Sequence, residues 1–597
     1  MSVGHRGDDG PVPTRFSARS ALDWRPQNKA SRRAVDVALV LGLPLVVLIV
    51  FGVNQWVHPY TPDSDFYYGL GHFGNDLIVR ATDPGYYWTR IGLIGPVYAL
   101  IHLFGDGWGY AIWRVVLLVI TVLPLYLLVK PRLGRIAAGT GVLILATNTT
   151  ILVTLMDFYP SSAVIAACSV LAGFGCLALE GRTPTHRTLC FAALAGAGSG
   201  WLMAIHIGSI AVNVGASFGL LIMMIVQYRK GAWRSVLSFG LGAALVFGVF
   251  LLWLRALFPG RNWFTANYEA ITQTGWDFFH EKTLNWLWSD PNLLIIPAAV
   301  AIGIIASTRR SQVQGPTRTL TVMLVLAALL ASIQQFRFGG QNLQLPYYYT
   351  QLWPFAIQLI AMAALGVATI GWQRRVLLVA AVLVLPLVGM SAWTFGWVPV
   401  GLVIAGLLVT FYAVAALVLQ RDQRGLAAQV GAFTMLVAML CGMQVLQNGL
   451  GALSGLVIAR QSPNQAFAES KPWIKPYFGL AKQAEGWVVA NTQGREMVTW
   501  TGGPNLELWG PAFIAVDNTV LTGLKLSPTD AQLTVIKRQR PATLAYTAPT
   551  VAAAQGFIKQ IPQATARAEL VECRSFQEEQ LSVGTCLARL TFPGRSR

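Results

Sequence analysis

Four aspartates lie within one short polar stretch, residues 60–90, although the chain contains few acidic residues. The 597 residues include only 26 Asp and Glu, and this stretch holds Asp63, Asp65, Asp76 and Asp83. It also contains cationic and aromatic side chains: Tyr67, Tyr68, His72, Arg80, Tyr86, Tyr87 and Arg90. A carboxylate within hydrogen-bond reach of a hydroxyl group can act as a general base. The stretch belongs to the loop 58–91, which is therefore a candidate catalytic loop, and a solvated polar face is the alternative interpretation.

Four further polar segments carry residue types that suit the same chemistry. Their candidate residues are Asp157 in "LMDFYPSS", His206 in "AIHIGS", Tyr268 and Glu269 in 259–291, and Arg337, Gln341, Gln344 and Tyr348 in 335–354. An acid at the centre of a membrane helix costs about 2.5–3.5 kcal/mol. A position near the interface lowers that cost, so Asp157 suggests a functional role without establishing one. A polar helix end is the simpler explanation for His206, and an interfacial aromatic belt explains most tryptophans.

Together these residue types indicate a site for a polar substrate that is attached to a lipid. Arginine suits an anionic phosphate because its planar guanidinium group forms two parallel hydrogen bonds. Arg90, His206 and Arg337 are the candidate phosphate ligands. Aromatic faces can stack on a sugar ring while amides bind its hydroxyl groups. The carboxylates would supply the base.

The composition requires that these polar segments connect membrane-spanning helices. The chain is 54% hydrophobic and 12% charged, with a mean hydropathy of +0.53, whereas a soluble domain has roughly 25% charged residues. Apolar runs of about 20 residues recur between residues 36 and 446, which is the length needed to cross a bilayer. The net charge is +18, but the basic residues lie mostly in short loops, as topology and anionic lipid require. Nucleic acid is therefore not an expected partner.

The positive-inside rule predicts about thirteen spans, with the N-terminus in the cytoplasm. The expected spans are 36–57, 109–129, 136–156, 160–180, 188–205, 208–227, 235–258, 292–307, 319–336, 347–372, 376–394, 398–420 and 426–446. The apolar run 91–105 is too short to cross, and we expect a re-entrant or interfacial helix there. With this choice the basic loops 130–135, 180–187, 228–234, 309–318, 373–375 and 421–425 all face the cytoplasm. All five candidate site segments then face outward and can converge on one cavity.

Two regions flank the predicted transmembrane domain, 36–446. Residues 1–35 are polar and basic and are expected to form a disordered cytoplasmic tail. Residues 447–597 are expected outside, and short β-like stretches and turn signals from about residue 465 predict a small α/β domain. Cys573 and Cys586 lie in this domain, where an oxidising compartment would allow a disulfide.

The residue pattern resembles the GT-C superfamily of membrane glycosyltransferases, which use polyprenyl-phosphate sugars. The likeness rests on "TPDSDFYYGLGHFGND" followed by "YYWTRIGLIGPVYALIHLFG", and on "LMDFYPSSAVIAACSVLAGFGCLALEG". The expected layout of thirteen spans and an outside tail is also similar to that of protein O-mannosyltransferases and lipid A aminoarabinose transferases. The high Ala, Gly, Val and Arg usage is typical of a GC-rich bacterium, so the expected location is a bacterial cytoplasmic membrane.

The resemblance implies an inverting glycosyltransferase that moves a sugar from a polyprenyl phosphate to a glycan, lipid or protein acceptor. It implies that Asp63 is the catalytic base, with Asp65 as the second choice. Asp65 and Asp157 could then hold Mg²⁺ or Mn²⁺, since hard cations take oxygen ligands. This sequence has an Asp-x-Asp pair where Asp-Glu or Glu-x-Asp is usual, so the roles of base and metal ligand could be exchanged. An O-antigen-type polymerase or ligase and a membrane transporter remain alternatives, although the sequence shows no internal repeat of the kind that transporters have.

Overall fold

The computed structural model describes the helical bundle and part of the C-terminal region. It covers residues 29–50, 67, 70–71, 74–75, 86–147, 151, 154–155, 159–273, 295–308, 313–338, 343, 346–368, 475–492, 497–502, 519–523, 533–534, 536–537, 540–578 and 581–593. The predicted spans after residue 372 lie outside this part, so the predicted number of thirteen spans remains a prediction.

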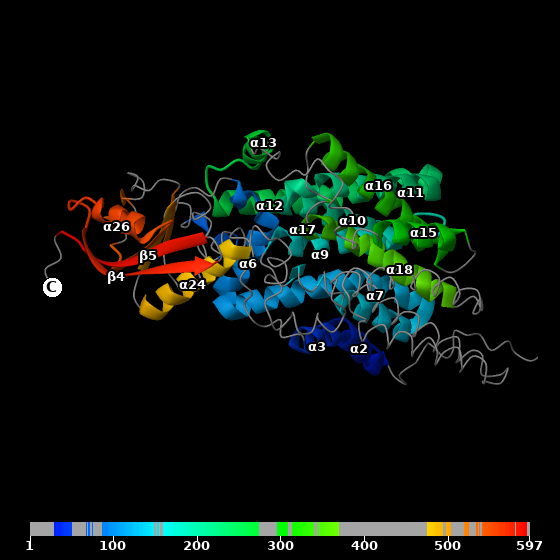
Figure 1. Cartoon of the computed structure of the whole chain (residues 1–597). Helices are drawn as coiled ribbons and strands as arrows, with labels where there is room; N and C mark the ends of the chain where they lie inside the picture. Colours follow the sequence, from blue (N-terminus) through cyan, green and yellow to red (C-terminus); the bar gives the residue numbers. More distant parts are fainter. Residues whose placement is uncertain are drawn as a thin grey trace, which may run out of the picture.

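Most of the described chain is helical (Figure 1). The helices before residue 369 are α2 (Lys29–Val37), the π-helix η1 (Ala38–Gly42), α3 (Leu43–Val50), η2 (Tyr87–Thr89), α6 (Ile91–Phe104), α7 (Asp106–Thr147), α9 (Pro160–Ala178), α10 (His186–Ile205), η3 (Ile207–Ser209), α11 (Ile210–Tyr228), η4 (Arg229–Gly231), α12 (Ala232–Leu257), α13 (Trp263–Gln273), α15 (Ile295–Ser307), α16 (Gln314–Phe338), α17 (Pro346–Tyr349), η7 (Thr350–Leu352) and α18 (Trp353–Ala368). Among the described residues, five segments are long and apolar enough to cross a membrane: 108–132, 160–178, 186–205, 207–257 and 314–337. The last but one contains both α11 and α12. These helices make the chain a multi-pass membrane protein.

Two predicted boundaries differ from the structure. Helix α2 begins at Lys29, inside the predicted disordered tail, and it is held because Asp36 accepts hydrogen bonds from Lys130 and Arg135 at 2.5 and 2.9 Å. The predicted loop 130–135 is helical, because α7 continues through it. Helix α7 is nevertheless not straight. A Cβ atom at Gly141 would lie 3.4 Å from Leu125 Cδ2, whereas the same positions in a straight helix would be about 24 Å apart.

The bundle therefore has two chemically different ends. The basic end consists of the turn of α7 near residues 130–135, the connections 179–185 and 229–231, and residues 308 and 313. The site end consists of residues 86–90, 159, 206–209, 258–267 and 346–352, which connect the opposite ends of the same helices. Helix α6 has 14 residues, as expected for a helix too short to span. It packs at the site end, where Gly92 approaches Ile205 of α10 and Gly95 approaches Trp253 of α12.

Close helix contacts hold the bundle together through small residues. A Cβ atom at Gly196 of α10 would lie 1.9 Å from the carbonyl oxygen of Phe239, and one at Gly242 of α12 would lie 2.0 Å from that of Ala193. Any larger residue would therefore separate α10 from α12. Small residues have this role in membrane helix pairs because lipid supplies no hydrophobic drive between helices.

The described C-terminal elements form a sheet between two helices. They are α24 (Lys475–Thr492), β1 (Met497–Gly502), β2 (Thr519–Gly523), β3 (Thr543–Ala548), α26 (Val551–Lys559), β4 (Arg567–Glu578) and β5 (Leu581–Thr591). The strand order is β2-β1-β3-β5-β4; β1 is parallel to β2 and β3, and β5 is antiparallel to β3 and β4. In Figure 1 the sheet lies beyond the site end of the bundle.

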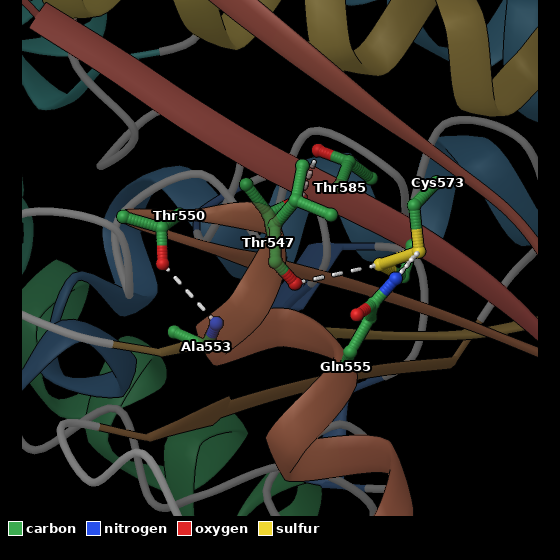
Figure 2. The surroundings of a disulfide bond; sticks show 8 residues. Thr547, Thr550, Ala553, Gln555, Cys573 and Thr585 are labelled. Carbon is green, nitrogen blue, oxygen red and sulfur yellow. Dashed lines mark hydrogen bonds between the residues drawn. A yellow bond between two sulfur atoms is a disulfide. The ribbon is translucent and has the colours of Figure 1, made fainter.

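A disulfide bond joins Cys573 to Cys586, as the sequence predicted. The two cysteines are direct partners on β4 and β5, and the bond lies against the first turns of α26 (Figure 2). There Gln555 Nε2 donates to Cys573 Sγ at 3.6 Å. The bond therefore cross-links the two strands of the β4–β5 hairpin beside α26.

Candidate active site

Arg90 is the central charged group at the site end. It lies between η2 and α6 and is only 3% exposed. Its NH1 group donates to Thr89 Oγ1 and to Asn267 Oδ1, both at 3.2 Å. Its guanidinium carbon also lies 5.0 Å from the centre of the Tyr86 ring.

The charge of Arg90 is not neutralised by a carboxylate of the described residues. Its hydrogen-bond partners among the described residues are neutral, and its buried Nε atom has no acceptor among those residues. A buried, uncompensated charge is costly, so this arrangement favours the binding of an anion. Burial lowers the pKa of Arg90, but the oxygens of Tyr67, Tyr86 and Tyr159 raise it by more, so the group remains a cation.

Helix α13 is tied to this arginine by a closed set of hydrogen bonds. Asn267 Nδ2 donates to the carbonyl oxygen of Trp263 at 2.9 Å, and Trp263 Nε1 donates to the carbonyl oxygen of Thr89 at 3.1 Å. Thr89 Oγ1 lies 3.4 Å from Asn267 Oδ1. The segment before α6 and the segment after α12 are thereby held together around Arg90.

Tyrosines from three separate segments gather beside Arg90. The Tyr67 ring centre lies 5.3 Å from that of Tyr87 and 5.8 Å from that of Tyr159. The Tyr159 hydroxyl lies 3.4 Å from the Tyr348 hydroxyl. Tyr67 also interacts with Arg90 through a side-chain hydrogen bond. Hydroxyl groups and aromatic faces therefore meet next to a buried cation.

His206 completes this cluster from the connection between α10 and η3. Its ring centre lies 5.4 Å from that of Tyr348, and the residue is buried. Burial and the charge of Arg90 lower the pKa of His206 well below its usual value. The imidazole is therefore neutral near pH 7, and it can offer one N–H donor to a ligand but no positive charge.

Trp88 and Arg261 lie near the segment that contains Arg90. Trp88 is buried, and its Nε1 atom has no acceptor among the described residues. The guanidinium carbon of Arg261 lies 5.6 Å from the centre of the Trp88 ring. A second cation therefore lies close to the segment that contains Arg90.

The structure brings together some of the predicted site residues and separates others. Those gathered at the site are Arg90, His206, Tyr67, Tyr86, Tyr87 and Tyr348. Arg337 is exposed at the end of α16, and it makes no ion pair with a described residue. Tyr268 and Glu269 are exposed on α13. Asp63, Asp65, Tyr68, His72, Asp157, Gln341 and Gln344 lie outside the described residues.

The sequence analysis did not select Asn267, Thr89 or Tyr159. It chose Tyr268 and Glu269 as substrate ligands, but on α13 these neighbours are exposed while Asn267 is 2% exposed. The pattern Trp263-x₃-Asn267 is the signal that was available, since residues four apart share one helix face. A polar residue next to a charged one is not otherwise distinctive.

The predicted metal site remains a prediction. Within the described part of the chain, no three His, Cys, Asp or Glu residues lie close enough together to bind a metal ion. The proposed ligands Asp65 and Asp157 are outside that part.

Comparison with solved structures identifies the fold. The chain is similar to ArnT from Cupriavidus metallidurans in its apo state, with 13% identity, a TM-score of 0.50, and coverage of 93% of this chain and 98% of that chain. It is also similar to the same protein bound to undecaprenyl phosphate, with 14% identity, a TM-score of 0.54, and coverage of 92% and 97%. No protein-family model and no curated protein matches the sequence. The resemblance to the GT-C superfamily is thus confirmed as a similarity of fold.

Proposed function

We propose that this protein is an inverting glycosyltransferase that uses a polyprenyl-phosphate sugar at the outer face of a bacterial cytoplasmic membrane. The observation that carries the proposal is the buried Arg90, which has no carboxylate partner among the described residues and has an unsatisfied Nε atom. A lipid phosphate would supply the negative counter-charge that the described residues do not give to this arginine. One similar solved structure contains undecaprenyl phosphate, and this supports the choice of ligand class.

In the proposed reaction, the carboxylate of Asp63 removes the proton from an acceptor hydroxyl group. The hydroxyl oxygen attacks the anomeric carbon of the sugar, and the bond between that carbon and the phosphate oxygen breaks. The electron pair leaves with the phosphate, so polyprenyl phosphate is released and the configuration at the anomeric carbon is inverted. Asp65 is the alternative base.

Arg90 stabilises the charge that develops on the departing phosphate. A donor that is already in place in a dry site stabilises such charge strongly, because it does not need to reorganise during the reaction. Neutral His206 donates one hydrogen bond, and the tyrosine cluster contacts the sugar. The acceptor is a cell-envelope glycan, lipid or protein. Mg²⁺ or Mn²⁺, if bound by Asp65 and Asp157, would stabilise the same negative charge.

The test is donor consumption by the purified chain in nanodiscs. Polyprenyl phosphates of mannose, arabinofuranose, glucose and galactose are each incubated with the wild type, Asp63→Asn and Arg90→Gln. We expect consumption of one donor by the wild type and its loss in both variants, with thermal stability retained. Equal turnover by Asp63→Asn would transfer the role of base to Asp65. Failure to bind any of the donors would contradict the proposed function.

A further inference from the structure

The most informative group that the proposed reaction does not use is the side chain of Asn267. It is almost completely buried, and it reaches Arg90 from a helix that lies 177 residues further along the chain. Among the described residues, its amide makes hydrogen-bonding contacts with Thr89, Arg90 and the carbonyl group of Trp263.

The orientation of this amide is fixed by its partners. Arg90 can only donate hydrogen bonds, so the atom that faces it must be the oxygen. The carbonyl group of Trp263 can only accept, so the atom that faces it must be the nitrogen. The two contacts measure 3.2 and 2.9 Å. Asn267 therefore presents an acceptor to Arg90 in one defined direction.

Residue 267 is a neutral asparagine and not an anionic aspartate, and this difference in charge matters. An aspartate has nearly the same shape as asparagine and would accept the same hydrogen bond from Arg90. It would also neutralise the arginine within the protein, as Asp36 neutralises Lys130 and Arg135 at the basic end. An amide fixes the guanidinium group and leaves its charge uncompensated.

We propose that Asn267 is a positioning residue of the anion site, which holds the Arg90 guanidinium in place while leaving its positive charge for the anion. Identification of that anion as a lipid phosphate rests on the proposed function. The positioning role itself rests on the contacts of Asn267 with Arg90, Thr89 and Trp263.

Helix α13 is itself held in place next to Arg90. The indole of Trp263 donates to the carbonyl oxygen of Thr89 at 3.1 Å, so the helix that carries Asn267 is fixed to the residue next to Arg90. The Trp263 ring also packs edge-on against Phe247 of α12, with ring centres 5.2 Å apart. The position of Asn267 is thus determined by the bundle and not by α13 alone.

The experiment measures the affinity of the full-length protein, in detergent, for undecaprenyl phosphate. The variants are Asn267→Asp, Asn267→Leu and Arg90→Gln. Asn491→Asp is the matched control, because Asn491 is exposed on α24 and its one side-chain hydrogen bond with a described residue is to the carbonyl oxygen of Trp487. Thermal stability is recorded for every protein.

We expect Asn267→Asp to weaken binding by roughly tenfold or more, since its carboxylate competes with the phosphate for Arg90. Its thermal stability should be equal to or above that of the wild type, because a buried charge is now compensated. Asn267→Leu should weaken binding by a smaller factor and lower the stability. Asn491→Asp should leave both quantities unchanged.

If Asn267 has a purely structural role, the affinity of each variant for undecaprenyl phosphate changes only when its thermal stability changes. A stable Asn267→Asp variant with wild-type affinity would overturn the inference, as would a folded Asn267→Leu variant with wild-type affinity. If Arg90→Gln itself binds undecaprenyl phosphate normally, the proposed phosphate site is wrong. That outcome is distinct from failure of the Asn267 inference, in which Arg90→Gln loses binding and the Asn267 variants do not.

Discussion

The two ends of the helical bundle differ in the partners of their cationic side chains. At the basic end, Asp36 pairs with Lys130 and Arg135, and Glu180 pairs with Arg132 at 2.9 Å. At the site end, Arg90 is more deeply buried than any of these side chains and is held by hydroxyl, amide and aromatic groups. A paired cation joins helices, whereas a buried cation with no carboxylate partner among the described residues is suited to bind an anion from outside. The difference distinguishes a structural contact from a candidate binding site, although both use the same kind of residue.

The largest expected effect comes from Arg90. Arg90→Gln should reduce sugar transfer by roughly 100-fold, because it removes a charged donor from the position of the leaving phosphate. Its thermal stability should not fall, since a costly buried charge is lost. Initial rates with the accepted donor test this. The control is Arg187→Gln, which alters an exposed cation on the first turn of α10, 3.9 Å from Glu180, and should leave activity near the wild-type level. Wild-type activity of Arg90→Gln would contradict the assignment of the site end as the phosphate-binding end.

Gly208 should show a smaller effect through His206. A Cβ atom at residue 208 would lie 2.3 Å from Cε1 of the His206 ring, so Gly208→Ala must displace the imidazole from the cluster. We expect a loss of transfer of roughly tenfold, which is less than the roughly 100-fold that loss of a positioned group costs, because the imidazole is displaced and not removed. Gly240→Ala is the matched control, because nothing lies within 4 Å of a Cβ atom there. If the two variants have equal rates, His206 does not contribute to the site.

Asp36 should affect stability and not catalysis. Asp36→Asn leaves Lys130 and Arg135 without their anion, and both have side chains that are largely shielded from solvent. We expect a loss of about 1 kcal/mol in the free energy of unfolding, because the pairs are only partly buried. Thermal unfolding and initial rates are to be compared with Glu569→Gln, which alters an exposed acid on β4. A change in rate at equal stability would contradict the structural assignment of the basic end.

The smallest expected effect is a pH dependence of stability that comes from His206. Its pKa is lowered in the folded protein by burial and by Arg90, so the unfolded chain binds a proton near pH 6.5 that the folded chain does not. Stability is therefore fully present above that pH and is lost as the pH falls towards the lower, folded pKa. Between about pH 7.5 and about pH 5.5, the melting temperature of the wild type should fall more than that of His206→Gln. Identical pH profiles would show that His206 is not held neutral.

The sequence predicted the class of protein because spans of apolar residues follow directly from the thickness of the bilayer. It predicted that α6 is too short to span, and it predicted the disulfide between Cys573 and Cys586. It did not predict that the segment 130–135 is helical. Proline disfavours a helix interior locally, but helix packing and the ion pairs of Asp36 override that preference here.

The candidate site was only partly accessible from the sequence. Arg90 and His206 were selected because their residue types suit phosphate and because they lie near the predicted membrane boundary. Asn267 was not selected, because an asparagine four residues after a tryptophan carries no distinctive pattern. Its importance arises only when α13 packs against residues 89 and 90. Arg337, chosen on the same grounds as Arg90, is exposed.

By itself, the sequence determined that the protein is a membrane protein with clustered polar residues, since composition and apolar run lengths act locally along the chain. Only the tertiary structure decided which cation is compensated and which is not. The charge state of a site depends on the groups that meet in space. Arg90, Tyr159, His206 and Asn267 come from four separate segments of the chain. No local sequence pattern predicts that these residues lie beside one another. No local pattern predicts that, among the described residues, Arg90 contacts an amide at residue 267 and not an acid.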